Sequence, residues 1–521
     1  MVDRWTGYGG SSPRTAPGWE LTELVGPSAM WGANGVVWSP SNELMVTQVF
    51  GAQVTAVDVD TGAARPFAPQ GDGIGAPDDG AFAADGTFFA TEPPNGRVSM
   101  RRLDGTVATL RDDLPAANGM TVSHDGTRLF VDEFRPGGRL LELDPTGERA
   151  PVILADDLAM PNAFAMGPDG ALWFPQVLAD EIWRYDLDRR HLERRFTGLA
   201  TPTAVKFDAA GRLLTSEGGS GELTSIDIVS GARATLARVN PGIDNFAIAP
   251  DQRLFVSHFT DGRLAEVTGG TERVLSPSGL IGPFGVTRLA DGRYATADAL
   301  AVNVVGVDGT TEVVASLLAQ LPGLAIDVAA IDDDLLILID RGQVMRRSSR
   351  DGTVRSVAGH LGRVTAMTEA PGGGALVVDA GAGRIVHIDG SGGIVGEPVV
   401  GLTDPRAVAV APDETIWVTH RGGATGFLHG RKVASVTGID DPHGIGVRAT
   451  TALIADPAHR QWVAVDPATG ATSVAVEGAP IGPPVVGSRM THAFSPVHAD
   501  GESFVVGGDG DGSLRRLSRP T

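Results

Sequence analysis

A short apolar segment that ends in a polar residue recurs along the chain about every 41 residues, as in ELMVTQ, TFFATE and RLFVDE. Alternation of apolar and polar residues over such segments predicts β-strands. A repeat of this length fits four short antiparallel strands, which form one blade of a β-propeller. The polar end positions are Gln48, Glu92, Glu133, Gln176, Glu217, His258, Asp298, Asp340, Asp379, His420, Asp456 and about Asp509.

Turn signals separate the first two strands of each repeat, as in HDG at 124–126, PDG at 168–170 and ADG at 290–292. Glycine after aspartate supplies the positive φ that a tight hairpin turn requires. An open β-solenoid is the alternative, but its coils are usually shorter and lack this hairpin. The repeats therefore predict an all-β propeller fold of about twelve four-stranded blades.

Twelve blades exceed the usual four to eight of one ring, so we expect two tandem six-bladed β-propellers. The end residues change from Gln, Glu or His to mostly Asp near 268–282, where Gly, Ser and Pro suggest a linker. The predicted domains are a flexible N-terminal lead-in at 1–27, a first propeller at 28–275 and a second at 276–521. A division into seven and five blades is the main alternative.

The charge and composition of the chain limit the classes of partner that it is expected to bind. The 42 Lys and Arg against 63 Asp and Glu give a net charge of −21, which disfavours a nucleic-acid partner. No apolar run of about 18 residues is present, so we expect no membrane partner. The absence of cysteine and of an apolar signal segment favours a cytoplasmic protein with a small-molecule substrate. Its oligomeric state is left open.

The first strand of each blade lines the channel of a propeller, so the residue that opens this strand lies near the axis. We located it eight residues before each turn position. In the first propeller this gives only oxygen-bearing side chains, namely Asn34, Asp78, Asn118, Asn162, Thr203 and Asp244. Such a set suits a hard divalent cation, calcium first and zinc, magnesium or manganese as alternatives. The competing explanation is that Asn and Asp bond their own backbone at strand starts.

The same count in the second propeller gives Phe284, about Ala325, Thr365, Arg406, His443 and a residue near Val485. These residues do not form an oxygen cage. Arg406 and His443, with Arg363 nearby, suit an anion, or else they form ion pairs that fill the channel. We therefore expect the reaction chemistry in the first propeller.

Two segments, AANGMTVSHDGTRLFVDEF (116–134) and MPNAFAMGPDGALWFPQVLADEIWRYDLD (160–188), resemble the senescence marker protein/gluconolactonase superfamily. The resemblance implies a six-bladed propeller with an axial divalent metal. Asn118 and Asn162 match two asparagine ligands of the family. Asn34 stands where the family has Glu and Thr203 where it has Asp, and the neighbouring Asp78 and Asp244 can supply the missing negative charge.

A looser resemblance is to streptogramin lyase, through PHGI (442–445) and ALWF (171–174). It would require His443 to act with His420 or His459. The sequence shows no convincing Glu partner for this constellation.

The leading functional hypothesis is a metal-dependent hydrolase that opens a lactone or a related ester. Asp244 or Asp78 is the candidate base, and His258 is the imidazole that can exchange a proton near neutral pH. The alternatives are a lyase acting on a cyclic ester and a non-catalytic double-propeller binding module. The residues expected either to anchor the metal ligands from behind or to form the pocket wall are Thr203, Glu92, Glu133, Gln176 and Glu217.

Overall fold

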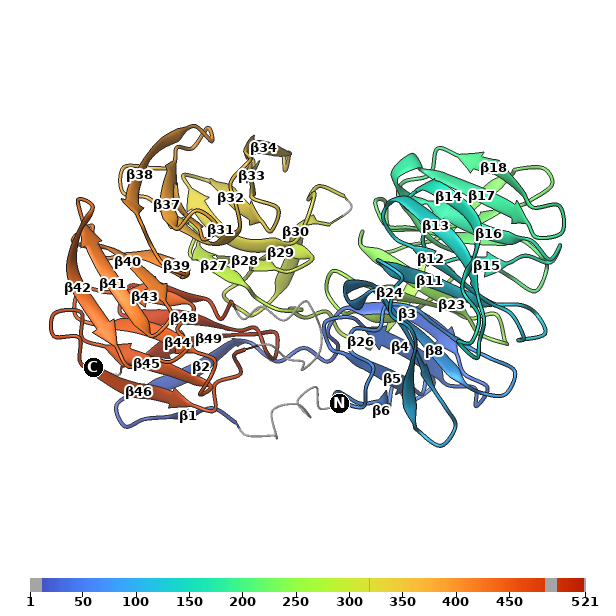
Figure 1. The fold of residues 1–521 in the computed structure, drawn as a ribbon, viewed down its shortest axis with the longest axis horizontal. Helices are drawn as coiled ribbons and strands as arrows, with labels where there is room; N and C mark the ends of the chain where they lie inside the picture. Colours follow the sequence, from blue (N-terminus) through green and yellow to red (C-terminus); the bar gives the residue numbers. More distant parts are fainter. Residues whose placement is uncertain (1–11, 318, 483–493, 520–521) are drawn as a thin grey trace. The chain divides into compact units, whose positions relative to one another are not determined.

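The computed structural model describes residues 12–317, 319–482 and 494–519. These residues form twelve antiparallel sheets in series (Figure 1), with two 3-10 turns, η2 (Pro93–Asn95) and η3 (Val177–Ala179), between strands. Within the described ranges, no helix is long and apolar enough to cross a membrane. The predicted all-β fold of two tandem six-bladed propellers is confirmed.

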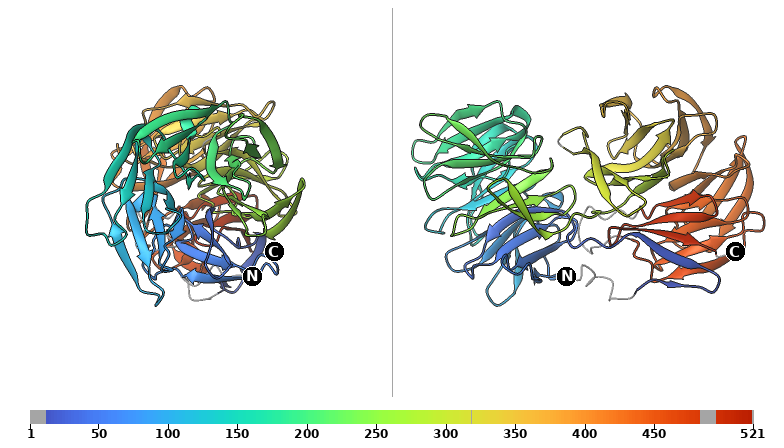
Figure 2. Two further views of the ribbon diagram at one scale, coloured as in Figure 1. Left: turned by 90° about the vertical axis from the view of Figure 1, so that its right-hand side faces the viewer. Right: turned by 180° about the vertical axis from the view of Figure 1, so that it is seen from behind.

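Unit 1 spans Ala29–Ser278 and holds six sheets, each made of four consecutive strands. The last blade packs on the first, and the end-on view in Figure 2 shows the sheets spread around a common centre. In chain order the blades are β3 (Ala33–Trp38), β4 (Leu44–Gln48), β5 (Gln53–Val57) and β6 (Ala64–Ala68); β7 (Gly80–Phe82), β8 (Phe88–Glu92), β9 (Arg97–Arg101) and β10 (Val107–Arg111); β11 (Ala117–Val122), β12 (Leu129–Glu133), β13 (Pro136–Leu143) and β14 (Val152–Ala159); β15 (Ala165–Met166), β16 (Leu172–Gln176), β17 (Glu181–Asp186) and β18 (His191–Thr197); β19 (Pro202–Phe207), β20 (Leu213–Glu217), β21 (Glu222–Ile226) and β22 (Arg233–Arg238); and β23 (Ile243–Ile248), β24 (Leu254–His258), β25 (Leu264–Thr268) and β26 (Thr271–Ser276).

Unit 2 contains the six sheets that follow, and its last blade also packs on its first. Its strands are β27 (Gly285–Arg288), β28 (Tyr294–Asp298), β29 (Ala301–Val305) and β30 (Thr311–Ser316); β31 (Ala325–Ile331), β32 (Asp334–Ile339), β33 (Gln343–Arg347) and β34 (Val354–Ala358); β35 (Val364–Glu369), β36 (Ala375–Asp379), β37 (Arg384–Ile388) and β38 (Ile394–Val400); β39 (Pro405–Val410), β40 (Ile416–His420), β41 (Gly423–Leu428) and β42 (Arg431–Thr437); β43 (Ile445–Val447), β44 (Ala452–Asp456), β45 (Gln461–Val465) and β46 (Thr472–Glu477); and β47 (Val497–Asp500), β48 (Ser503–Gly508) and β49 (Ser513–Ser518).

The hairpin turns have the predicted backbone conformation. Gly126 and Gly170 have φ values of 68° and 73°, in the left-handed region that glycine adopts without steric cost. Two blades replace this glycine by Asn42 and Gln252, and both residues adopt the same region, at 62° and 69°. The turn geometry is therefore retained even where its preferred residue is not.

The hydrophobic core of each unit lies between neighbouring blades. Between the last and first blades of unit 1, for example, Val36, Leu44, Val46 and Phe255 are fully buried in one cluster. Burial of this apolar surface is the main favourable contribution to stability, at roughly 25 cal/mol per Å². The blades consequently depend on their neighbours and on closure of the ring.

Unit 2 is closed by strands from the start of the chain (Figure 1), so the prediction of a flexible lead-in at 1–27 was wrong for its described residues, 12–27. Strand β2 (Glu20–Val25) pairs antiparallel with β49 and is the outer strand of the last blade. Strand β1 (Arg14–Thr15) adds a fifth strand to the preceding blade by pairing with β46. The apolar residues of β2 pack into the same core, so this segment is ordered by burial and by strand pairing.

Unit 1 is thus inserted between two strands of unit 2. The chain leaves unit 2 at Ser28 and re-enters it at Gly279, and these positions adjoin because the Ser28 hydroxyl donates a hydrogen bond to the Leu280 carbonyl. The predicted linker at 268–282 is shorter than expected, since β26 at Thr271–Ser276 forms the last strand of unit 1.

Removal of β1 and β2 is expected to destabilise unit 2 selectively. A chain that starts at residue 29 loses the outer strand of the last blade and leaves one edge of β49 unpaired. Calorimetry should show one unfolding transition shifted down by several degrees or lost and another unchanged. Arg14→Ala is the control, because it removes only an exposed ion pair with Glu477 and should cost less than about 1 kcal/mol. An unchanged calorimetric profile of the truncated chain would contradict ring closure by β2.

Candidate functional site

A β-bulge lies at the start of the first strand in four blades of unit 1. The register shifts fall between Ala33 and Val36, Ala117 and Met120, Pro202 and Ala204, and Ile243 and Phe246. Each shift contains one predicted axial residue, Asn34, Asn118, Thr203 or Asp244. A bulge bends the strand and changes the direction of its side chains. These polar side chains therefore do not follow the regular alternation between the two faces of the sheet.

Five of the six predicted axial residues are buried, and Asp244 is half-buried. Asn34 accepts a hydrogen bond from the backbone N–H of Val49 at 3.3 Å. The Thr203 hydroxyl interacts with the Ser216 hydroxyl at 2.8 Å and with the Ile243 carbonyl at 3.3 Å, so its side chain connects its own blade to the next one. The contacts of these two side chains are therefore structural ones.

Asp78, Asn118 and Asp244 form an electrostatically coupled group. Burial raises the pKa of Asp78 to about 7, with a further increase from Asp79, and a side-chain hydrogen bond with Asn118 opposes the shift. Burial also raises the pKa of Asp244 well above its ordinary value, and the charges of Asp78 and Asp79 add to this effect. The structure thus brings together both predicted carboxylates and one of the predicted amides.

Three further charged residues adjoin this group, and sequence reasoning did not identify them. Asp79 accepts hydrogen bonds from the backbone N–H groups of Gly80 at 2.9 Å and Met120 at 3.1 Å, so it links two blades. Asp132 is fully buried, and one of its carboxylate oxygens has no hydrogen-bond partner. Burial lowers the pKa of the Lys206 ammonium, and the charge of Asp79 opposes this.

We name Asp78, Asp79, Asp132, Asp244, Lys206 and Asn118 the axial cluster of unit 1. It contains four carboxyl groups and one ammonium group. Burial raises the pKa of all four carboxyls, and repulsion by neighbouring carboxylates adds to this effect at Asp78, Asp132 and Asp244. An added cation would relieve this penalty. Within the described ranges, no three Asp, Glu, His or Cys side chains are already arranged to hold a metal ion.

The sequence contains weak signals for the three additional members. Asp79 follows the predicted Asp78 directly. Asp132 occupies the position before the strand end, where other blades carry Thr91 or Ser257. Lys206 is one of only two lysines in the chain, the other being Lys432.

The strand-end residues stabilise their own blades. Glu92 is fully buried and accepts hydrogen bonds from the backbone N–H of Gly75, from Asn95, from Ser99 and from Arg97, the last at 2.6 Å. Glu133 pairs with Arg135 and Arg139, and Glu217 accepts from the Ala200 N–H at 2.6 Å. These carboxylates are internal anchors, which differs from the expected role in a pocket wall.

Gln176 and His258 occupy equivalent strand ends and are also buried. The Gln176 side-chain oxygen and both ring nitrogens of His258 have no hydrogen-bond partner. Burial lowers the pKa of His258, which keeps its imidazole neutral at neutral pH. His258 therefore lies inside the blade, where contact with solvent or substrate is minimal.

The channel of unit 2 differs from that of unit 1 as expected. Bulges contain Thr365 and Arg406, and the bulge of β31 contains Ile326 rather than the expected Ala325. Phe284 precedes β27, and its ring lies 4.3 Å from that of Phe494. The residue expected near Val485 lies outside the described ranges.

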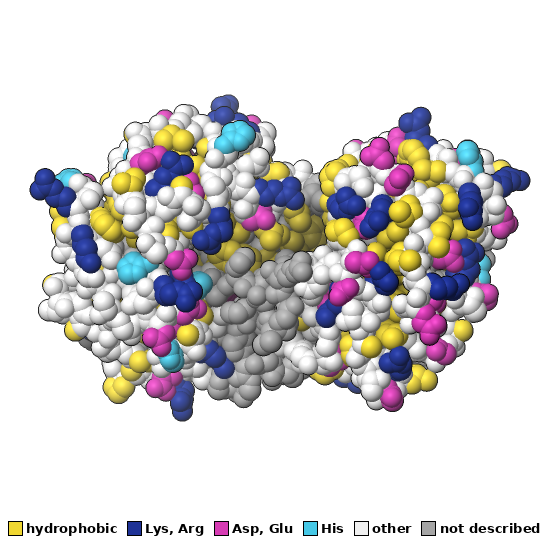
Figure 3. Space-filling view, in the orientation of Figure 1, with side chains coloured by type: hydrophobic (Ala, Val, Ile, Leu, Met, Phe, Trp, Pro, Cys, Tyr) yellow, Lys and Arg dark blue, Asp and Glu magenta, His cyan; other side chains and the backbone are white. Residues whose placement is uncertain are grey.

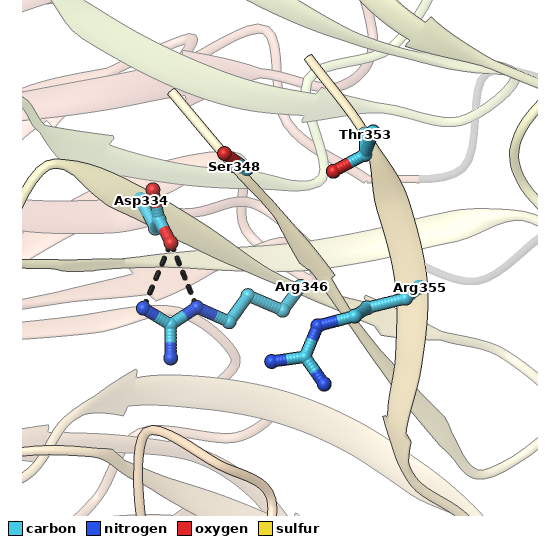
Figure 4. A pocket seen from close by; sticks show the side chains of 5 residues that line it. All are labelled: Asp334, Arg346, Ser348, Thr353 and Arg355. Atoms are coloured by element: carbon cyan, nitrogen blue, oxygen red, sulfur yellow. Dashed lines mark hydrogen bonds and ion pairs between the residues drawn. The ribbon is translucent and has the colours of Figure 1, made fainter. Parts of the chain in front are cut away.

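A pocket of about 340 Å³ lies on the second blade of unit 2, between its outer strands (Figure 4). Asp334, Arg346, Ser348, Thr353 and Arg355 line it. Asp334 accepts two hydrogen bonds from Arg346 on one oxygen, and the Ser349 N–H donates to the other. Both oxygens of this carboxylate therefore already have partners within the blade. On the face drawn in Figure 3, acidic and basic side chains are interspersed over both units.

The chain is similar to several solved structures at low sequence identity. No family model matches the chain, and no curated protein matches it. Among solved structures, a streptogramin B lyase is 17% identical over 54% of this chain and 94% of its own, with a TM-score of 0.40. Virginiamycin B lyase from Staphylococcus aureus is 15% identical over 56% and 98%, with a TM-score of 0.39. Regucalcin, a calcium-binding protein from Agrobacterium tumefaciens, is 18% identical over 46% and 85%, with a TM-score of 0.38.

Glu92→Ala is expected to destabilise unit 1 by about 3–5 kcal/mol, because it leaves the partly buried Arg97 and the Gly75 N–H without their acceptor. Glu43→Ala, which removes a more exposed pair with Arg65, should cost at most about 1 kcal/mol. Chemical denaturation of both variants measures the difference. Equal losses would mean that Glu92 is not an anchor.

Asp78→Asn tests the axial cluster through pH. The pKa of Asp78 is about 7 in the folded chain and near 3.8 in the unfolded one, so the native state binds the proton more tightly. The contribution of Asp78 to the free energy of unfolding therefore falls as the pH rises from about 4 to about 7. In a chelator, the stability of Asp78→Asn relative to the wild type should therefore increase over this interval. Thermal unfolding at several pH values measures it, and a pH-independent difference would contradict the shift.

Proposed function

We propose that unit 1 is a divalent-cation-dependent hydrolase that opens a lactone or a related ester at its axial cluster. The observation that supports this most directly is the coupling of the Asp78 and Asp244 carboxyls beside the Asn118 amide. Two carboxylates and an amide oxygen are ligands that calcium and similar hard cations prefer. The unpartnered oxygen of buried Asp132 also marks a local excess of acceptors.

The oxygen-bearing side chains of the axial cluster are of the type that such a cation prefers, and binding would require them to rearrange, since no preformed metal group exists among the described residues. Asp78, oriented by Asn118, is the proposed main ligand, and Asn162 is the further oxygen donor proposed from a neighbouring blade. Lewis-acid polarisation of an ester carbonyl is the chemistry that a bound divalent cation supplies at such a site. The raised pKa values imply that cation binding is coupled to proton release, because the ligands must ionise.

Asp244 is the proposed proton acceptor, since it is more exposed than Asp78. In ionised form it takes a proton from the attacking water, whose oxygen bonds to the acyl carbon. The bond between the acyl carbon and the ring oxygen then breaks, and the leaving oxygen takes the proton from Asp244. One water molecule is consumed, and the product is a hydroxy acid. His258 takes no part in the proposed reaction, because its side chain is buried within its blade.

Asp244→Asn should reduce kcat for a responsive lactone by about 10²–10⁴-fold, the usual contribution of a general base. The assay is a lactone panel with added calcium or with chelator, and product analysis in heavy-oxygen water should show one incorporated label. Asp60→Asn is the control, because Asp60 is exposed. A label-free product would indicate a lyase. Turnover that chelation and Asp244→Asn both leave unchanged would reject the proposal.

Calcium binding gives a readout that does not depend on finding the substrate. Isothermal titration in two buffers of different ionisation enthalpy should show proton release near pH 6.5, because the pKa of Asp78 is about 7 before the cation binds. Asp78→Asn should weaken binding at least about tenfold. Absence of calcium binding, or binding that Asp78→Asn does not change, would exclude the axial cluster as the cation site.

A further inference from the structure

A cluster of basic side chains lies at the channel end of unit 2 and is not used by the proposed function. Blades three to five contribute Arg363, Arg406, Arg421 and His443, which lie around two aspartates. We name these residues, with Asp404 and Asp441, the arginine cluster. Its surplus of positive charge is notable in a chain whose net charge is −21.

Strand pairing places these residues at one end of the channel. Arg406 lies in the bulge that opens β39, and Arg421 follows the end of β40. These two strands are antiparallel neighbours in which Pro405 pairs with His420, so the start of one adjoins the end of the other. Arg363 directly precedes β35, the first strand of the blade that packs next to it.

Arg406 is the fixed member of the arginine cluster. Its side chain is only 14% exposed, and it donates to Asp441 and contacts Asp404 at 3.4 Å. Although burial alone raises the pKa of Asp441, the hydrogen bond from Arg406 and the charge of His443 lower it overall. This carboxylate is therefore ionised and holds the guanidinium in place.

Arg363 and Arg421 retain unused donors. Their closest approaches to Asp404 are 3.8 and 4.0 Å, which exceed hydrogen-bond distance. Their side chains are 63% and 80% exposed. Each guanidinium has five N–H donors, so the two aspartates satisfy only a minority of those in the cluster. The remaining donors can bind a small oxyanion.

An aromatic pair lies at the same end of the channel, because Phe284 precedes β27, the first strand of its blade, as Arg363 precedes β35. The rings of Phe284 and Phe494 lie 4.3 Å apart, and both are partly buried against the core cluster that contains Leu361 and Val364. These two core residues flank Arg363 in the chain. Thr365, in the bulge of the same strand, has a buried hydroxyl without a partner.

We infer that this end of unit 2 binds a small organic carboxylate with an aromatic or apolar body. The planar fork of Arg matches the two oxygens of a carboxylate, and phosphate shares this chemistry. The phenylalanines at the same channel end favour a ligand that combines the anion with an apolar group, which inorganic phosphate lacks. The site is distinct from the axial cluster of unit 1 and does not rest on the proposed function.

The test titrates the full chain with benzoate, acetate, benzyl alcohol and inorganic phosphate at constant ionic strength, followed by calorimetry. Benzoate should bind at least about tenfold more tightly than acetate or benzyl alcohol, because only benzoate engages both the arginines and the aromatic surface. No benzoate binding, or tighter binding of phosphate, would overturn the proposal.

Two variants identify the site. Arg363→Gln combined with Arg421→Gln should weaken benzoate binding at least about tenfold while leaving the thermal unfolding unchanged, since both side chains are exposed. The matched control is Arg350→Gln with Arg355→Gln, which removes two exposed charges from another blade of unit 2. Equal loss of benzoate binding in both double variants would mean that the loss comes from the lower overall positive charge. It would contradict the proposed binding site.

Discussion

In several blades of both propellers, the polar side chain at the end of the second strand accepts a hydrogen bond from the backbone of the loop that leads into the same blade. Gln48 binds the Trp31 N–H, Glu92 binds that of Gly75, and Asp298 binds that of Gly282. Buried acceptors and donors must be paired, so this bond fixes the loop where it enters the channel. In the blade of Gln48, the bulge that contains Asn34 follows directly after this loop.

The position so fixed carries different chemistry in the two units. In unit 1 this end of the channel contains carboxyl groups whose ionised form is disfavoured by burial. A cation bound there would lower the free energy of the ionised groups. Lys206 supplies one internal cation, but its own pKa is lowered by burial, and Asp132 retains an unpartnered oxygen. The channel is therefore only partly neutralised by the chain itself.

Much of the fold could be predicted because it is local and periodic. The strand ends at Gln48 and Glu92 and the turn at Gly126 recur at fixed spacing, and the offset of eight residues located the bulges. The role of β2 could not be predicted, since Leu21 pairs with Leu517 at the opposite end of the chain and β2 belongs to no repeat. Lys206 was missed because its alignment with Asp79 arises only when blades two and five meet at the axis.

The strand-end glutamates show why site residues are harder to predict than strands. A polar residue at a strand end looks the same in sequence whether it lines a pocket or holds a loop, and only its partners separate the two. Glu92 has four partners inside its blade, whereas Asp244 is surrounded by like charges that raise its pKa. A carboxylate that accepts hydrogen bonds from nearby donors contributes to stability. A carboxyl group that lies near other carboxylates is instead stabilised by binding a proton or a cation. This contrast, rather than position in the repeat, is the basis on which we propose the axial cluster as the site of chemistry.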